Sequence, residues 1–203
     1  MYSNYEINNI YEKIQLKDKV VLGDPCYSLN SVSIINNVLP GTYCTIIRVV
    51  DCDSWGNRVS RLMAFHENHA HKIQYNDDNP ETLYDSFTGL KCSDSEIIGV
   101  DSGQAGIYDY DYFCENEKER NYNDKNSWYR KICDMTIESH GGCLDNKCVV
   151  SNSGYGDGGY KTYLFKTKDT NQVVGFVIDF DVENEYDYKY EGEYDFDDEE
   201  EEY

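Results

Sequence analysis

The stretch at residues 147–180, KCVVSNSGYGDGGYKTYLFKTKDTNQVVGFVIDF, decides the fold class. It contains three runs rich in β-branched and aromatic residues, at 147–151, 161–168 and 172–180. A glycine-rich turn at 154–159 and a polar turn at 169–171 separate these runs. We therefore predict three strands that two consecutive hairpins join into a meander.

Further strands are predicted upstream of this stretch. Residues 42–50 and 58–65 are dense in β-branched and apolar residues, and the turn-forming residues 51–57 between them indicate a hairpin. Residues 14–22 are expected to form a strand with a bend at Lys17-Asp18, and a short apolar strand is expected at 96–101.

Helical signals are fewer. Residues 109–120 combine helical spacing with an acidic first turn and basic residues near the end. Residues 128–137 are compatible with a helix or a strand, residues 27–39 with a short helix capped by Ser28, and the first twelve residues with a short helix or an ordered arm. About seven short strands and one to three short helices predict a mainly β fold, an antiparallel β-sandwich or a strongly bent sheet. Residues 76–90 are polar and are expected to form a surface excursion.

Length and charge suggest one domain followed by a tail. The chain has 203 residues and a net charge of −21, and the last 23 residues hold 13 Asp or Glu and a single Lys. We therefore expect a single β-rich domain at 1–180 and an acidic, tyrosine-rich tail at 181–203, which such charge density predicts to be solvated and flexible. No apolar run is long enough to span a membrane and no export signal is visible, so the eight cysteines are expected to be reduced thiols in the cytoplasm.

Three glycine- and aspartate-containing segments differ from generic strands and turns. They are GDPCY at 23–27, GVDSGQAGIYD at 99–109 and SNSGYGDGGY at 151–160. Together with PGTY at 40–43 and the strand at 175–180, they resemble the uncharacterised family called domain of unknown function 4241, found in bacterial and phage proteins. The resemblance covers about residues 20–180 and implies a shared fold, but it implies no activity.

The first segment offers a candidate nucleophile. Cys26 follows a rigid Asp24-Pro25 turn, and a catalytic cysteine would need a base such as histidine within hydrogen-bonding reach. The alternative is a packed thiol, with the Asp24 carboxylate holding the turn by accepting hydrogen bonds from backbone amides. We favour the structural alternative.

The other two segments suggest a ligand site or tight turns. Carboxylates such as Asp101 and Asp157 can act as acids or bases or hold a cation, and glycine lets the backbone approach a ligand. The alternative is that these side chains satisfy buried amides in the turns. If the three turns converge, Asp24, Cys26, Asp101 and Asp157 are the catalytic candidates, and the ligand-binding candidates are Gln104, Asp109, Tyr155 and Tyr160.

One histidine cluster has some metal-ligand character. His66, His69 and His71 lie close in sequence, and imidazoles two residues apart on a strand share a face. The cluster lacks the paired spacing of a closed zinc site, so a hydrated surface loop is favoured. No cofactor is expected.

Two functions from different classes remain. The first is a non-catalytic acidic protein that recognises a basic protein partner. The second is a small-ligand-binding or hydrolytic protein whose Asp/Cys site the three turns form, so the sequence leaves open whether the chain is an enzyme. Direct nucleic-acid binding is disfavoured because the chain has 39 acidic residues and only 18 basic residues to neutralise phosphates. No membrane partner is expected.

Overall fold

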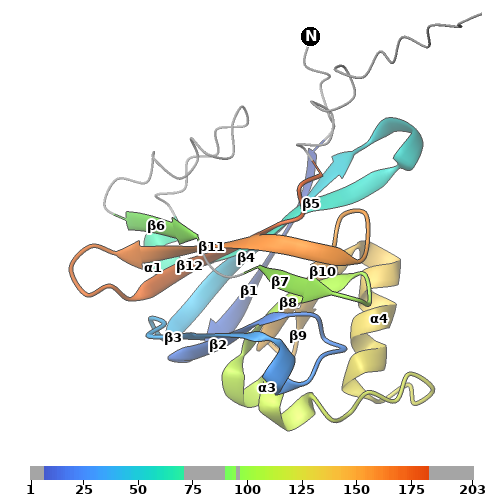
Figure 1. Cartoon of the computed structure of the whole chain (residues 1–203), viewed down its shortest axis with the longest axis horizontal. Helices are drawn as coiled ribbons and strands as arrows, with labels where there is room; N and C mark the ends of the chain where they lie inside the picture. Colours follow the sequence, from blue (N-terminus) through green and yellow to red (C-terminus); the bar gives the residue numbers. More distant parts are fainter. Residues whose placement is uncertain (1–6, 71–89, 95–96, 183–203) are drawn as a thin grey trace, which may run out of the picture.

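Two antiparallel β-sheets form the centre of the computed structural model, which describes residues 7–70, 90–94 and 97–182 (Figure 1). The seven-stranded sheet has the order β1-β4-β5-β12-β11-β6, with β7 also paired to β11, and the five-stranded sheet has the order β3-β2-β8-β10-β9. The predicted mainly β fold is confirmed. The strands of the larger sheet are β1 (Ile7–Leu16), β4 (Gly41–Asp51), β5 (Asn57–His66), β6 (Leu90–Asp94), β7 (Ile98–Val100), β11 (Gly158–Thr167) and β12 (Val173–Asp179). Those of the smaller sheet are β2 (Lys19–Gly23), β3 (Ser33–Asn36), β8 (Gln104–Asp109), β9 (Gly141–Leu144) and β10 (Cys148–Asn152).

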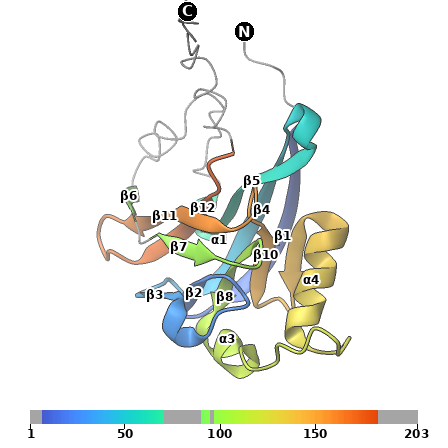
Figure 2. The same ribbon diagram turned by 45° about the vertical axis from the view of Figure 1, so that its right-hand side comes forward.

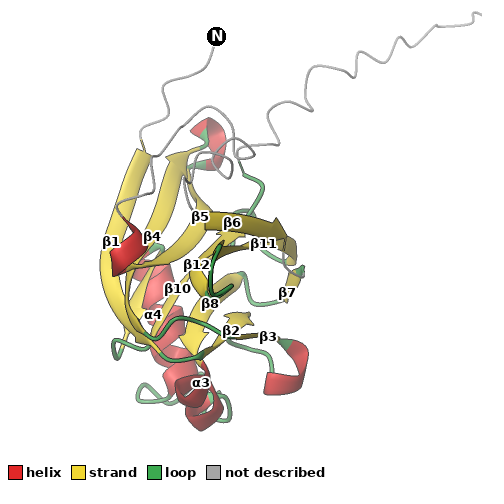
Figure 3. Ribbon diagram, turned by 90° about the vertical axis from the view of Figure 1, so that its left-hand side faces the viewer, coloured by secondary structure: helices red, strands yellow, loops and turns green. Residues whose placement is uncertain are grey.

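Three helices lie beside the sheets in the described part of the chain (Figure 3). They are α1 (Glu67–Ala70), α3 (Tyr110–Asn116) and α4 (Trp128–Ser139), and two single 3-10 turns occur at η1 (Leu29–Ser31) and η2 (Asp53–Trp55). None of the described helices is long and apolar enough to cross a membrane.

Side-chain caps explain where the two longer helices begin. The Asp109 carboxylate accepts a hydrogen bond from the amide of Tyr112, so the start of the helix predicted at 109–120 is confirmed as α3. The prediction is wrong at its end, because α3 stops at Asn116 and has no basic residue in its last turn. The Ser127 hydroxyl accepts one from the amide of Arg130 at the start of α4. Residues 128–137, which the sequence left open between helix and strand, are therefore helical.

The main hydrophobic core lies between the two sheets. Alternate residues of the small sheet point into it, such as Leu22 and Ile107, and they meet Leu62 and Phe176 from the large sheet. Phe176 is fully buried and its ring lies 5.9 Å from that of Tyr43. The two sheets are therefore held face to face by apolar packing.

A second core lies on the outer face of the small sheet. The intervening residues Val21 and Tyr108 point outward and pack against Phe113 of α3 and Trp128 of α4. Helix α4 packs along β9 and β10. Figure 2 shows α4 at the side of the molecule. Both faces of β2, β8 and β10 are thus covered, which explains why these strands carry continuous apolar runs rather than alternating ones.

The predicted meander is wrong in its first half. The hairpin of β11 and β12 forms with a turn at 168–172, as predicted. However, β10 pairs with β8 and β9 in the small sheet and does not pair with β11. The glycine-rich segment between β10 and β11 carries the chain from one sheet to the other. Sequence patterning cannot distinguish such a crossing from a hairpin, because both need the same turn residues.

The amino-terminal predictions also need correction. Of the first twelve residues, those that the structure describes belong to the edge strand β1, which begins at Ile7, rather than to a helix or an arm; residues 1–6 lie outside the described ranges. The bend at Lys17-Asp18 separates β1 from β2 in the other sheet. The helix expected at 27–39 is only the turn η1, where Ser28 makes no capping hydrogen bond, followed by β3.

The estimate of about seven strands is too low. The hairpin of β4 and β5 and the short strand β7 match the prediction. Strand β8 lies in a segment taken for a loop, and β9 begins with two glycines, which carry no strand signal. The surface excursion predicted at 76–90 lies almost entirely outside the described residues, as do His71 and the tail beyond Val182.

We predict that Phe176→Ala lowers the free energy of unfolding by about 3–5 kcal/mol, because it leaves a cavity where the two sheets meet. Tyr11→Ala, on the edge strand β1, is the control, since Tyr11 is 66% exposed. It should change stability by about 0.5 kcal/mol or less. Urea unfolding of both variants measures the difference, and equal losses would contradict the proposed core.

Candidate functional site

The topology of the small sheet brings the three unusual segments together. Strands β2, β8 and β10 are antiparallel neighbours, so the end of β2, the start of β8 and the end of β10 lie at one edge. Gly23 pairs with Gly106, and Asn152 pairs with Gln104. We call the residues 23–27, 99–104 and 151–160 at this edge the three-turn junction.

The Asp24 carboxylate is the centre of the three-turn junction. It is fully buried, and its Oδ1 accepts hydrogen bonds from the Cys26 amide and the Ser102 hydroxyl, both at 2.7 Å. Its Oδ2 accepts from the amides of Asp101 at 2.8 Å and Ser102 at 2.7 Å. Donors from the protein itself therefore replace water around the lone pairs of this buried carboxylate.

Further contacts join the same segments. The Tyr27 hydroxyl lies against Gly99, where an added Cβ would approach it to 3.4 Å, and the pKa of Tyr27 is raised to about 12 by burial and by a hydrogen bond to Asp101. The Asp157 carboxylate accepts a hydrogen bond of 3.0 Å from the Gly103 amide, and the Gly103 carbonyl accepts one of 3.0 Å from the Ser153 amide. The first and third segments are thus each bonded to the second.

Cys26 lies inside the three-turn junction but in an environment that disfavours a thiolate. Burial, then the hydrogen bond and negative charge of Asp24, raise the pKa of the Cys26 thiol to about 12. Reactive cysteines need the opposite shift, which neighbouring positive charge supplies. The thiol therefore stays protonated at neutral pH.

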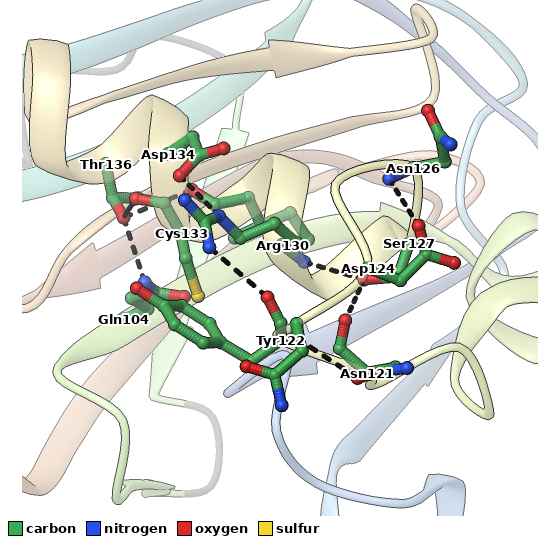
Figure 4. Close-up of polar contacts among 12 residues, drawn as sticks. Gln104, Asn121, Tyr122, Asp124, Asn126, Ser127, Arg130, Cys133, Asp134 and Thr136 are labelled. Atoms are coloured by element: carbon green, nitrogen blue, oxygen red, sulfur yellow. Dashed lines mark hydrogen bonds and ion pairs between the residues drawn. The ribbon is translucent and has the colours of Figure 1, made fainter.

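The ligand-binding candidates are divided among different places. Asp109 lies at the far end of β8, roughly 17 Å from Gln104 at about 3.3 Å per residue, where it caps α3 and accepts a hydrogen bond from the Lys17 amide. The Gln104 side chain is buried and donates to the Thr136 hydroxyl of α4 at 2.9 Å (Figure 4). Tyr160 is buried, and its hydroxyl bonds the carbonyls of the preceding turn. Among these candidates only Tyr155 is exposed.

The histidine candidates lie away from the three-turn junction. His66 is buried at the end of β5, with its ring 5.3 Å from that of Tyr43 and 6.1 Å from that of His69. His71 is outside the described residues. Within the described ranges, no group of three or more His, Cys, Asp or Glu side chains has the geometry of a metal site.

A cleft beside the three-turn junction contains residues that the sequence did not suggest. It has a volume of about 220 Å³ and lies where the start of β5 approaches the third segment. No single sequence motif marks it, because Gly103 belongs to the second segment and four residues belong to the third, whereas Arg58 and His140 come from distant parts of the chain. Its lining residues are Asn57, Arg58, Val59, Gly103, His140, Asn152, Gly154, Tyr155 and Gly156.

We predict that Asp24→Asn lowers the free energy of unfolding by about 2–4 kcal/mol, because an amide leaves at least one buried N–H group without an acceptor. Asp157→Asn is the matched control, since that carboxylate is exposed and accepts a hydrogen bond from the Gly103 amide. Its cost should be about 1 kcal/mol or less. Denaturant unfolding measures both, and a cost for Asp24→Asn no larger than that of the control would contradict its central role.

We also predict that Cys26 reacts with iodoacetamide at pH 8 about a hundredfold more slowly than the same cysteine in a synthetic peptide of residues 20–30. The raised pKa leaves few thiolates, and their higher intrinsic nucleophilicity offsets only part of that loss. Mass spectrometry of the Cys26 peptide after timed alkylation measures the rate. A rate that levels off near pH 8 would instead indicate an activated thiol.

Comparisons with known proteins place the chain in one family. No curated protein and no solved structure matches the chain. A family model described as "Protein of unknown function (DUF4241)" matches residues 16–178, which include all three segments of the three-turn junction. The chain therefore belongs to the DUF4241 family of proteins of unknown function.

Proposed function

We propose that this protein is a non-catalytic, acidic interaction protein that recognises a basic protein partner. One observation carries the proposal: the groups from which a hydrolytic site would be built are used to hold the fold. The Asp24 carboxylate accepts four hydrogen bonds from the protein, and the Cys26 thiol is protonated beside it. Neither group is available as a base or a nucleophile.

The distribution of charge supports a basic partner. The described residues contain 21 acidic and 16 basic residues, whereas the remaining 18 acidic residues are accompanied by only two lysines. Most of this excess follows Val182, in a run that closes with Asp197-Asp198 and four glutamates. Such charge density attracts polycations and speeds their association.

The acidic run begins at a fixed point on the body. The buried Asp179 carboxylate pairs with Arg61 at 3.1 Å, and the Phe180 amide donates to the Ser60 carbonyl. Val182 packs against Gly154, where an added Cβ would lie 2.7 Å from its side chain. Val182, after which the acidic run begins, therefore lies beside the three-turn junction.

The proposal places the protein in the cytoplasm, without membrane or direct nucleic-acid partners. Eight free cysteines support a reducing compartment. The excess of carboxylates over basic side chains would repel phosphate backbones.

A small-ligand or hydrolytic function is the second candidate. The observation that favours it is the meeting of Asp24, Asp101 and Asp157 within one hydrogen-bonded junction. A melting temperature raised by a divalent cation, and not raised in Asp101→Asn, would support this second candidate over the first.

We predict that the triple variant Glu200→Gln, Glu201→Gln, Glu202→Gln binds polylysine about threefold to tenfold more weakly than the unmodified full chain at low salt. Each exposed ion pair contributes up to about 1 kcal/mol, and added salt should weaken binding further. Fluorescence anisotropy of labelled polylysine measures the affinity.

The matched control removes the same number of charges from the body through Glu67→Gln, Glu115→Gln and Glu138→Gln, which are all exposed. Its affinity should stay within about twofold of the unmodified chain. Equal weakening by both triple variants would show that only net charge matters. That outcome, or no binding at low salt, would overturn the proposed role of the acidic run.

A further inference from the structure

The cleft lined by Arg58, His140 and Tyr155, which we call the Arg58 cleft, differs in charge from the rest of this acidic protein. Its lining residues include an arginine, a histidine and two asparagines but no carboxylate. Its charge and its hydrogen-bond donors favour an anion.

Arg58 differs from the other arginines whose partners are known. Arg61, Arg120 and Arg130 each form an ion pair with a carboxylate. Arg58 forms none with any described carboxylate; its Nη1 instead donates to the carbonyl of Asn57 at 3.0 Å. The remaining N–H groups of Arg58 therefore donate to no Asp or Glu among the described residues. A guanidinium holds its N–H groups in a planar fork that matches the oxygens of a phosphate or carboxylate.

One aromatic ring lies beside Arg58, and a second ring contacts the first. Its guanidinium lies 6.0 Å from the centroid of the Tyr155 ring, which in turn makes an edge contact with Trp55 at 6.0 Å. Tyr155 is 37% exposed and Trp55 is 56% exposed. Exposed aromatic rings next to a cation provide a surface on which a flat ligand ring can stack.

Two glycines in the lining of the Arg58 cleft leave room beside the backbone. Gly103 and Gly156 have φ values of +68° and +119°, and no atom lies within 4 Å of the position where either would carry a Cβ. His140 ends α4 in a left-handed conformation with φ 64°, a position that glycine or asparagine commonly occupies. This conformation sets the imidazole among the lining residues, where it can add a hydrogen bond.

We propose that the Arg58 cleft binds a small anion carried on a flat ring, with a phosphate or carboxylate group at Arg58 and His140 and the ring against Tyr155 and Trp55. The volume of about 220 Å³ is below that of drug-sized pockets, which begin at about 300 Å³. It accommodates one anionic group and one ring. This site does not depend on recognition of a basic partner by the acidic run.

Phenyl phosphate is the probe and Trp55 is the reporter. The only other tryptophan, Trp128, is 2% exposed in the second core, so a ligand in the Arg58 cleft should change mainly the emission of Trp55. With the full chain we expect saturable quenching with a Kd of about 1 mM or tighter, as the ligand's size allows. Inorganic phosphate should bind about threefold to tenfold more weakly, because it lacks the ring.

Arg58→Gln should weaken phenyl phosphate binding at least about tenfold, since charge-assisted hydrogen bonds are lost. Arg130→Gln is the control, because it makes the same change in net charge away from the cleft. Arg130 lies ten residues before His140 along α4, which at about 1.5 Å per residue is about 15 Å. It should leave the affinity within about twofold. Melting temperatures of both variants check that each is folded.

Three outcomes would overturn the proposal. No quenching up to about 10 mM phenyl phosphate excludes an anion site of the affinity expected from ligand size. Equal weakening by Arg58→Gln and Arg130→Gln would show that only net charge attracts the anion. Equal affinities for inorganic phosphate and phenyl phosphate would show that the ring of the ligand makes no favourable contact with the site. A loss of polylysine binding in the tail variants would affect none of these results.

Discussion

The buried Asp24 carboxylate is the constraint on which one end of the molecule depends. Burying a charge is costly unless donors replace water, and four donors do so here. Three of the four come from Asp101 and Ser102, so the turn after β2 is tied to the entry of β8. The amide of Gly103 then continues the connection to Asp157 and the third segment. Removing the carboxylate would leave several of these donors without acceptors.

This arrangement gives a physical role to each of the three segments of the three-turn junction. GDPCY supplies the acceptor, DSG supplies the donors, and the glycine-aspartate turn receives the next amide, so each motif is needed by another one. The sequence alone favoured a structural role for Asp24, because an Asp-Pro turn needs an acceptor for its backbone amides. It did not indicate which distant amides that carboxylate also holds, because the antiparallel order of β2, β8 and β10 brings them together.

Local patterning predicted what is local in the fold. The hairpins of β4 with β5 and of β11 with β12 have strong strand-forming residues around turn residues. Asp109 correctly indicated the start of α3. The pairing of β10 with β8 was missed because the decision depends on burial of both faces, which no local signal reports. The Arg58 cleft was missed because it depends on tertiary packing. Tyr155 lies in a sequence motif, but Arg58 approaches Tyr155 only because β5 packs beside the third segment.

The two proposed sites have opposite charge preferences and share a boundary. Gly154 lines the Arg58 cleft and also contacts Val182, where the acidic run begins. At physiological salt, charges within about 8 Å still interact, so Asp181, the described carboxylate next to Val182, would disfavour an anion within that distance. A basic partner that neutralises Asp181 would then raise the affinity of the cleft for its anion. Thermodynamic linkage requires the reverse as well, because the anion would strengthen binding of the basic partner by the same factor.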